Sequence, residues 1–394
     1  MTVRVGVEEE FHVVDRERGS LVPRADVLLD GLPGGTYTRE MARSIVETNS
    51  EVHASLEGLH DDLLRTRRGL DAAAARHGLA VIGAGTAPLG RVEAVDVTPD
   101  ARYRAMADEY RRVADEQLIC GAQVHVDVPD RDSAVRALCA LGPWLPPLLA
   151  LSASSPFWLG SDTGYASWRT MLWQRWPTAG PAGCFRDAAE YDGAVAGLIR
   201  SGVISDAGMI YYDVRPSAHQ GTLELRVCDA CPRPETVVMI AGLFRALVTD
   251  VLARADRPGY RACDGRHEWL RAATWRAARS GLEAELIDPE TRRPAPAARV
   301  MGTLLRRLRP ALEEYGDWEL VRDLVARTVA NGSTARRLRA AAAREDLLAA
   351  VDLLAAETRG ERPARKPART SPFARAARVL PTAEPRPVRV KSTE

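Results

Sequence analysis

The chain has 394 residues, of which 46% are hydrophobic and 27% are charged. This length suggests one large domain or two ordinary ones, and the apolar content excludes a chain that is disordered throughout. Lys and Arg number 54 against 53 for Asp and Glu, so a net charge of +1 gives no global field to attract nucleic acid or an anionic membrane. Any anion-binding site must therefore be local.

The sequence also predicts the cellular compartment of the protein and the redox state of its cysteines. No apolar run approaches the roughly 20 residues that span a bilayer, and the N-terminal residues lack the pattern of a secretory signal. We therefore expect a cytoplasmic protein without membrane contact, with its six scattered cysteines reduced. Cys228 and Cys231 form a C-x-x-C motif, which can hold zinc or act in redox chemistry. Without a second pair or a thioredoxin-like pattern, the sequence favours two small residues after a strand.

Strand and helix patterns alternate over the first part of the chain. Alternating polarity predicts strands at 3–15, 45–52, 79–82, 121–128, 209–215 and 221–228. Apolar residues at helical spacing predict helices at 56–77, 103–118 and 136–152. Together they predict an α+β fold, with a mainly antiparallel sheet that carries helices on its outer face.

The second part of the chain reads differently. Residues 234–357 repeat Leu, Ala and Arg at helical spacing and should be mostly helical. Residues 359–394 are dense in Pro and Arg and show no apolar period, which predicts a disordered basic tail. We therefore expect a single domain over residues 1–358, followed by the tail.

Polar residues share one face of several predicted strands, because successive side chains of a strand point to opposite faces. These same-face sets are Glu8, Glu10 and His12; Glu47, Asn49 and Glu51; Gln123, His125 and Asp127; Asp213 and Arg215; and Thr222, Glu224, Arg226 and Cys228. A solvated sheet face also alternates in this way, and it is the ordinary interpretation of any one segment.

The composition of these faces favours a binding site instead. Carboxylate and amide oxygens are the ligands that Mg²⁺ prefers, and the planar Arg side chain suits phosphate. The chain has no P-loop, kinase signature, nucleophile elbow or H-E-x-x-H motif, so a nucleotide would have to be held by metal and Arg. Glu9 points to the opposite, apolar face and is expected in a structural ion pair or a cap, not in metal binding. Trp173 and Trp176 are expected in core or lid packing.

Ten segments, in order, resemble one known family. They include GVEEEF at 6–11, GAQVHV at 121–126 and GTLELRVCD at 221–229; the others lie at 46–48, 85–88, 151–158, 162–167, 173–178, 213–216 and 331–337. The resemblance is to the bacterial carboxylate-amine ligases, also called glutamate-cysteine ligase type 2, of the glutamine-synthetase-like superfamily. It runs from residue 3 to about residue 342.

The resemblance implies a glutamine-synthetase-like catalytic fold whose sheet forms the floor of an active-site funnel. It also implies ATP and Mg²⁺ as cofactors, small-molecule carboxylate and amine substrates, and a homodimer. The implied metal ligands are Glu8, Glu10, Glu47 and Glu224, together with Gln123 or His125, between which the sequence does not decide. Arg215 and Arg226 are the implied catalytic, phosphate-contacting residues. The implied nucleotide- or substrate-binding residues are Arg169, Arg175, Arg336 and Arg337.

Three functions fit these observations. The first is an ATP-dependent carboxylate-amine ligase that forms an amide or γ-glutamyl-type bond through an acyl phosphate, with glutamate-cysteine ligase activity as one form of it. The second is a phosphotransferase of the guanidino-kinase type, and the third is a non-catalytic nucleotide-binding relative. The product separates the first two: an amide indicates a ligase, and a stable phosphorylated compound indicates a kinase.

Overall fold

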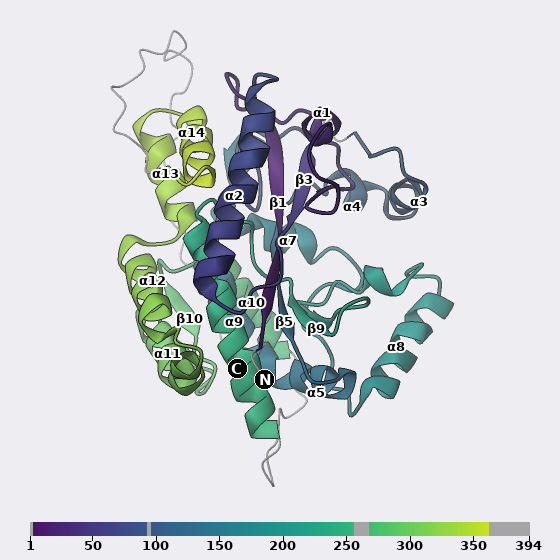
Figure 1. Ribbon diagram of the computed structural model, residues 1–394, viewed down its shortest axis with the longest axis vertical. Helices are drawn as coiled ribbons and strands as arrows, with labels where there is room; N and C mark the ends of the chain where they lie inside the picture. The colour runs from purple at the N-terminus through teal and green to yellow at the C-terminus, as the bar shows by residue number, and fades with distance from the viewer. Residues whose placement is uncertain (1–2, 93–95, 256–267, 362–394) are drawn as a thin grey trace, which may run out of the picture. The chain divides into compact units, whose positions relative to one another are not determined.

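A seven-stranded antiparallel sheet organises the protein (Figure 1). The structure is a computed structural model that describes residues 3–92, 96–255 and 268–361. The strand order is β2-β3-β1-β5-β9-β8, and β4 pairs with the far end of β1. The strands are β1 (Val5–Asp15), β2 (Tyr37–Arg39), β3 (Ile45–Asn49), β4 (Leu79–Ile82), β5 (Ala122–Asp127), β8 (Val214–Pro216) and β9 (Thr222–Leu225).

The register aligns the polar residues across neighbouring strands. Glu10 lies opposite Glu47, and Glu8 lies opposite Gln123. Further along the sheet, Glu224 lies opposite both His125 and Arg215. Because side chains that face each other across antiparallel strands are close neighbours, this pairing gathers the polar residues of five strands on one face.

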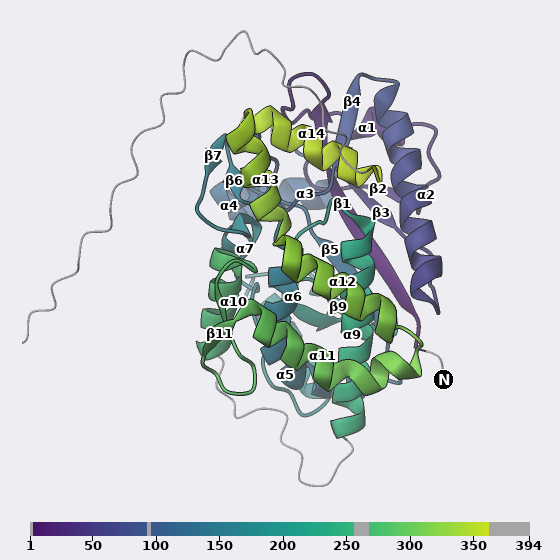
Figure 2. The same ribbon diagram turned by 90° about the vertical axis from the view of Figure 1, so that its left-hand side faces the viewer.

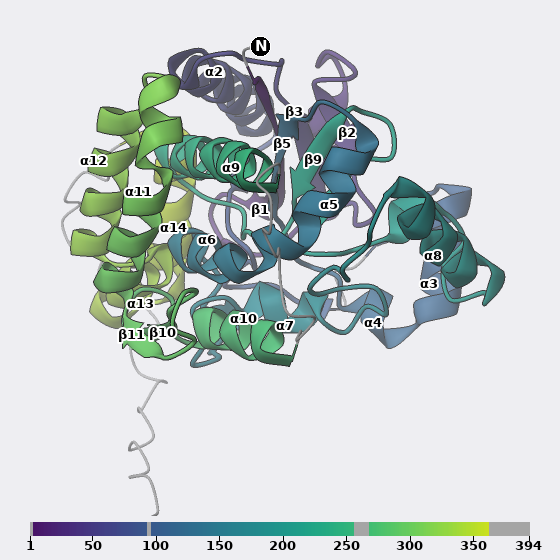
Figure 3. The same cartoon turned by 90° about the horizontal axis from the view of Figure 1, so that it is seen from below.

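The opposite face of the sheet packs against two long helices, α2 (Leu56–Ala75) and α9 (Pro234–Ala255) (Figure 3). Val7, Val124 and Leu225 from three strands are buried in one core cluster with side chains of both helices. Ser55 caps the start of α2 by accepting a hydrogen bond from Gly58 N. Because α2 and α9 pack against it, the apolar face of the sheet is closed to water, and the polar face is left for a binding site.

Further helices surround this core, and Figure 2 shows the late ones stacked along one side of the molecule. The remaining helices are α1 (Ala25–Leu29), α3 (Ala101–Tyr110), α4 (Arg112–Asp115), α5 (Arg131–Leu141), α6 (Leu145–Ser152), α7 (Trp168–Trp173), α8 (Ala188–Arg200), α10 (Glu268–Ser280), α11 (Ala297–Glu314), α12 (Trp318–Asn331), α13 (Thr334–Arg344) and α14 (Leu347–Thr358), with short 3-10 helices at Gly142–Trp144 (η2) and Ala207–Met209 (η3). Two small hairpins pair β6 (Phe157–Trp158) with β7 (Ser161–Asp162) and β10 (Glu285–Ile287) with β11 (Pro294–Pro296).

The predicted elements hold except at three places. The strand predicted at 209–215 is wrong over most of its length, because η3 and a loop precede the three residues of β8. The helix predicted at 103–118 breaks into α3 and α4 at Arg111, whose φ of 48° is left-handed. The helix predicted at 136–152 is likewise divided into α5, η2 and α6, with prolines in the first turns of the later two.

Two long helical stretches, Arg131–Ser152 and Pro234–Ala255, are apolar enough to cross a membrane by length and composition. This corrects the expectation that no run approaches that length. In their most apolar windows, 83% and 72% of the residues are buried inside the protein, as expected for core helices.

The cysteine prediction also needs correction at one place. Cys139 of α5 and Cys184 form a disulfide, although all cysteines were expected to be reduced. Cys120, Cys228 and Cys231 are free and buried, so the C-x-x-C motif lies inside the fold. The predicted basic tail lies, from residue 362 onward, outside the described residues.

Candidate active site

Three carboxylates converge on the polar face at the β2–β3–β1 side of the sheet. Glu10, Glu40 and Glu47 each offer an oxygen, and these oxygens lie within 4.8 Å of one another. Burial, with Glu40, Glu8 and Glu10 nearby, raises the pKa of Glu47 well above its ordinary value. Burial and the neighbouring Glu10 raise the pKa of Glu40 to about 7. Carboxylates that repel one another in this way are stabilised by a bound cation.

Glu10 is further held by two donors. Gly121 N donates to Glu10 Oε2 at 2.5 Å, and Gln123 Nε2 donates to Glu10 Oε1 at 3.0 Å. Gln123 therefore presents its amide nitrogen to Glu10, while its buried Oε1 has no hydrogen-bond partner among the described residues. A buried acceptor without a donor is costly, and a cation would satisfy it.

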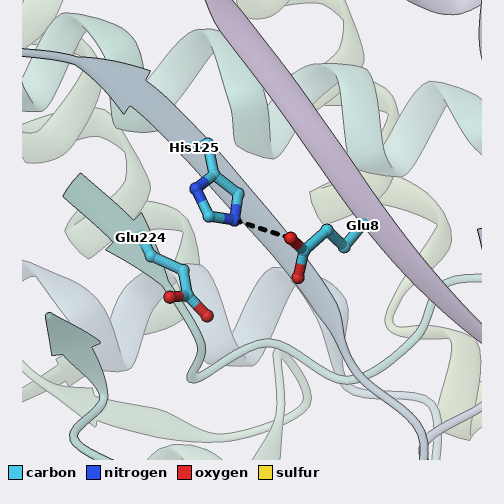
Figure 4. Close-up of side chains that lie close together, drawn as sticks. All are labelled: Glu8, His125 and Glu224. Carbon is cyan, nitrogen blue, oxygen red and sulfur yellow. Dashed lines mark ion pairs between the residues drawn. The ribbon is translucent and has the colours of Figure 1, made fainter. Parts of the chain in front are cut away.

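A second acidic group lies one step along the sheet (Figure 4). Glu8 of β1, His125 of β5 and Glu224 of β9 each offer an atom within 4.8 Å of the other two. The imidazole lies between the two carboxylates, with Nε2 at 3.2 Å from Glu8 Oε1. His125 Nδ1 contacts Thr222 Oγ1 at 3.0 Å, which orients the ring. These residues come from three strands and meet because of the register.

Two arginines enclose Glu224. Arg215 Nε donates to Glu224 Oε2 at 2.7 Å, and Arg226 Nη1 donates to Glu224 Oε1. Burial alone would raise the pKa of Glu224, but Arg226 and Arg215 outweigh it and lower the pKa to about 2. Arg215 is fixed further by the carbonyls of Gly208 and Ile210, at 2.8 and 2.7 Å. The guanidinium groups are thus oriented before any ligand arrives.

Arg169 reaches the same face from α7. Its backbone N–H donates to Ser155 Oγ at 3.1 Å, and Ser155 Oγ in turn donates to the buried Asp229 at 2.7 Å. The guanidinium makes long contacts to two backbone carbonyls and lies over the Trp173 ring, and its buried Nε has no hydrogen-bond partner among the described residues. Gly121 leaves room for it, because a Cβ there would lie 2.5 Å from Arg169 Nη2. Arg169 is therefore held in position with donors to spare.

These groups surround a cavity of about 230 Å³. Its lining includes carboxylates (Glu8, Glu10, Glu40 and Glu47), arginines (Arg102, Arg169, Arg215 and Arg226) and aromatic residues (Tyr103, Trp173, Trp176 and Tyr211), together with Gln117, Gln123 and several apolar residues. Oxygen ligands clustered beside preoriented guanidinium groups suit a divalent cation that bridges phosphate oxygens. The residues present therefore fit Mg²⁺ and a nucleoside triphosphate.

Comparison with known proteins agrees with this geometry. A model of the family described as Glutamate-cysteine ligase family 2 (GCS2) matches residues 4–353. The chain belongs to glutamate-cysteine ligase family 2.

Among its relatives in family 2, a Frankia casuarinae protein named "Putative glutamate--cysteine ligase 2-2" is 54% identical over 92% of the chain and 42% of its own length. A Mycolicibacterium smegmatis protein of the same name is 49% identical over 90% of the chain and 89% of its own length. The chain thus spans less than half the length of the Frankia relative.

Solved structures show the same fold at low identity. A glutamate--cysteine ligase from Francisella tularensis, solved in complex with AMP, superposes with a TM-score of 0.70 at 12% identity over 91% of this chain and 89% of that one. A bifunctional glutathione synthetase from Pasteurella multocida gives a TM-score of 0.68 at 15% identity, over 91% of this chain and 52% of that one. The predicted α+β fold class is confirmed.

Three residues that the family 2 resemblance implied lie away from the cavity. Arg175 pairs with Glu116, and Arg337 pairs with the buried Glu357 at 2.8 Å. Arg336 lies beside Arg337 on α13, where its backbone N–H donates to Ser333 Oγ. None of the three lines the cavity, so their roles in nucleotide binding stay predictions. The other predicted site residues come together, with His125 and Glu224 directly behind the lining.

The sequence reasoning missed part of this family 2 site. Glu40 follows the three-residue strand β2, which is too short to give an alternating pattern, and only its pairing with β3 brings Glu40 to Glu47. Arg102 and Tyr103 begin a helix from another part of the chain. Trp173 and Trp176, which were expected in packing, are buried in the core and also line the cavity.

Proposed function

We propose that the protein is an Mg²⁺- and ATP-dependent ligase that joins a carboxylate to an amine. The observation that carries this proposal is the cluster of Glu10, Glu40 and Glu47 in a cavity whose wall also holds oriented arginines. Bound Mg²⁺ would neutralise phosphate charge and align the γ-phosphate of ATP. Membership of glutamate-cysteine ligase family 2 and the shared fold of a solved glutamate--cysteine ligase support it.

The reaction has two steps. A carboxylate oxygen of the first substrate attacks the γ-phosphorus of ATP, the bond to ADP breaks, and an acyl phosphate forms. The amine nitrogen of the second substrate then attacks the acyl carbon, phosphate leaves, and the amine loses a proton to water or a weak base. No side chain of the protein forms a covalent bond, so positioning and charge neutralisation supply the rate.

The arginines have separate parts in these steps. Arg226 and Arg215, held by Glu224, neutralise the charge of the transferring phosphoryl group as catalytic residues. The buried Nε atoms of Arg226 and Arg169 have no hydrogen-bond partner among the described residues and can donate to phosphate or acyl oxygens. Because Arg215 is also fixed by two carbonyls, it needs little reorganisation when the ligand binds.

The experiment is a screen for phosphate release from ATP with pairs of amino-acid carboxylates and amines, and L-glutamate with L-cysteine is the first pair because of the names of the relatives. Mass spectrometry identifies the product. An amide formed together with one phosphate and one ADP is the expected result. A stable phosphorylated compound would instead indicate the phosphotransferase, which the comparisons do not support. ATP binding without turnover for every pair would indicate a non-catalytic relative.

Three further points belong to the same proposal. We propose that the enzyme works in the cytoplasm, that it is a homodimer, and that residues 1–358 form the single catalytic domain. Light scattering of the purified protein tests the dimer. Turnover by a chain that ends at residue 358, compared with the full chain, tests whether the rest is dispensable.

A further inference from the structure

The cavity is lined by side chains of both charges. Its carboxylates gather at the sheet, whereas Arg102 enters the lining from the first turn of α3. Tyr103, the next residue, also lines the cavity. A substrate that binds at the carboxylates can therefore also meet the positive charge of Arg102 in the same cavity.

Arg102 differs from the other arginines of the cavity in its surroundings. Its side chain is 44% exposed, against 14% for Arg215 and 12% for Arg226. Its ion-pair partner is Asp206, with Nε–Oδ2 and Nη2–Oδ1 distances of 3.1 and 3.4 Å, and Asp206 is itself 43% exposed. Exposed pairs of this kind contribute little, so an incoming anion can replace Asp206 at low cost.

The neighbouring groups suit a carboxylate. Burial raises the pKa of both Tyr103 and Tyr211, so both phenols stay neutral and can donate hydrogen bonds. Arg102 is within electrostatic influence of both. A guanidinium group with its planar fork binds a carboxylate through two parallel hydrogen bonds, and the two phenols can add hydrogen bonds to it.

We infer that Arg102 binds a carboxylate that does not react, either on the acyl substrate or on the amine substrate, and thereby selects substrates that carry a second anionic group. This inference rests on the proposed ligase function, because only a carboxylate-amine ligase needs to distinguish the reacting carboxylate from another one. Asp206 occupies Arg102 in the absence of substrate and competes with it. Arg102 is thus a specificity-determining residue on the wall of the cavity that also holds the metal cluster.

Two pairs of probe compounds show whether the bound carboxylate belongs to the acyl substrate or to the amine substrate. The two members of each pair differ by one carboxylate. L-Glutamate and 4-aminobutyrate share a reacting carboxylate, but only L-glutamate has the second one. L-Cysteine and cysteamine share the amine, but only L-cysteine has the carboxylate. Arg102→Gln should raise the KM of the carboxylate-bearing member of one pair by about ten- to a hundredfold, the range for a lost charged hydrogen bond, with a smaller change in kcat. The KM of its partner lacking the carboxylate should hardly change.

Asp206→Asn is the matched control. If the ion pair only fastens α3 to η3, both variants break the same contact and should change KM in the same direction. If Arg102 binds substrate, Asp206→Asn removes the competitor and should leave KM unchanged or lower it, opposite to Arg102→Gln. Arg102→Lys should recover part of the affinity because it keeps the charge but loses the fork. Equal effects of Arg102→Gln on both members of both pairs, or parallel effects of the two variants, would overturn the inference.

Calorimetry without ATP distinguishes a failure of the Arg102 inference from a failure of the proposed ligase function. Tighter binding of L-glutamate or L-cysteine to the wild type than to Arg102→Gln, with no such difference for 4-aminobutyrate or cysteamine, supports the carboxylate site whether or not turnover is detected. Turnover by the wild type with no difference in binding between wild type and variant would leave the ligase standing and remove Arg102 from its specificity.

Discussion

Two adjacent glutamates on β1 have opposite environments. Glu9 points to the apolar face, where it is 2% exposed and forms a bidentate ion pair with Arg67 of α2, with an Nε–Oε2 distance of 3.0 Å. Arg67 also donates to the carbonyls of Pro232 and Cys231. Glu10 points to the polar face and receives only a backbone N–H and an amide, while two more carboxylates lie beside it.

The difference separates a charge that supports the fold from one that awaits a ligand. On the apolar face, every requirement of Glu9 is met by residues of the chain, so the pair is complete without any bound group. On the polar face, like charges are held together against their mutual repulsion, and this arrangement is stable only when a cation or a proton joins them. Substitutions at neighbouring positions should therefore have opposite consequences.

The largest effect is expected at Glu10. Glu10→Gln keeps the shape but removes a charge that a hard cation requires, and we expect turnover to fall by about ten-thousandfold, which corresponds to about 5 kcal/mol in the activation barrier. The metal-free protein should be no less stable than the wild type, because one source of repulsion is removed. Steady-state kinetics over a range of Mg²⁺ concentrations and urea unfolding in chelator measure both. A variant with full turnover would remove Glu10 from the metal site.

The second effect concerns stability instead of turnover. Glu9→Gln leaves the Arg67 guanidinium buried without its counter-charge, and this should lower the free energy of unfolding by about 3 to 5 kcal/mol. The Mg²⁺ dependence of any residual activity should match that of the wild type, since Glu9 faces away from the cavity. Urea titration with and without Mg²⁺ tests this. If the variant changed the Mg²⁺ requirement and kept its stability, the contrast between the two faces would be wrong.

This contrast was predictable from the sequence because it follows from strand parity alone. Alternation placed Glu9 apart from Glu8 and Glu10 and predicted a structural ion pair or a cap for it, and the structure shows the ion pair, with Arg67. Parity also grouped His125 with Gln123 and Glu224 with Arg226. It did not give the register, and so did not show that Glu224 would lie between Arg215 and Arg226.

Other parts of the site depended on tertiary contacts that no local pattern carries. Glu40 reaches the metal cluster only through the pairing of a three-residue strand. Arg102 reaches the cavity from the first turn of α3, a helix outside the strands whose alternation marked the other site residues. The disulfide between Cys139 and Cys184 joins positions 45 residues apart, and no motif connects them.

Glu224 tests a case between the two extremes, because it offers a ligand atom to the second acidic group and is also paired with two arginines. We expect Glu224→Gln to lower the free energy of unfolding by about 2 to 3 kcal/mol, less than Glu9→Gln, since Arg215 keeps two carbonyl acceptors. Its pKa of about 2 means that the stabilisation is complete above the ordinary value of 4.5 and is lost as pH falls toward 2. Unfolding measured across that range should show a larger loss in the wild type than in the variant, in which the other carboxylates with lowered pKa values still titrate.

The smallest effect is a pH dependence at Glu40, and its sign is opposite to that of Glu224. A pKa raised to about 7 by burial and by Glu10 means that the folded, metal-free protein holds a proton which the unfolded chain has already lost above pH 4.5. Stability of the metal-free protein should therefore fall as pH rises from about 5 through 7, and Glu40→Gln should flatten that part of the curve. Saturating Mg²⁺ should reverse the trend in the wild type, because the cation replaces the proton. Thermal unfolding at several pH values, in chelator and in Mg²⁺, measures both curves. A wild-type curve that is flat in chelator, or identical in both conditions, would show that Glu40 does not share the cation with Glu10 and Glu47.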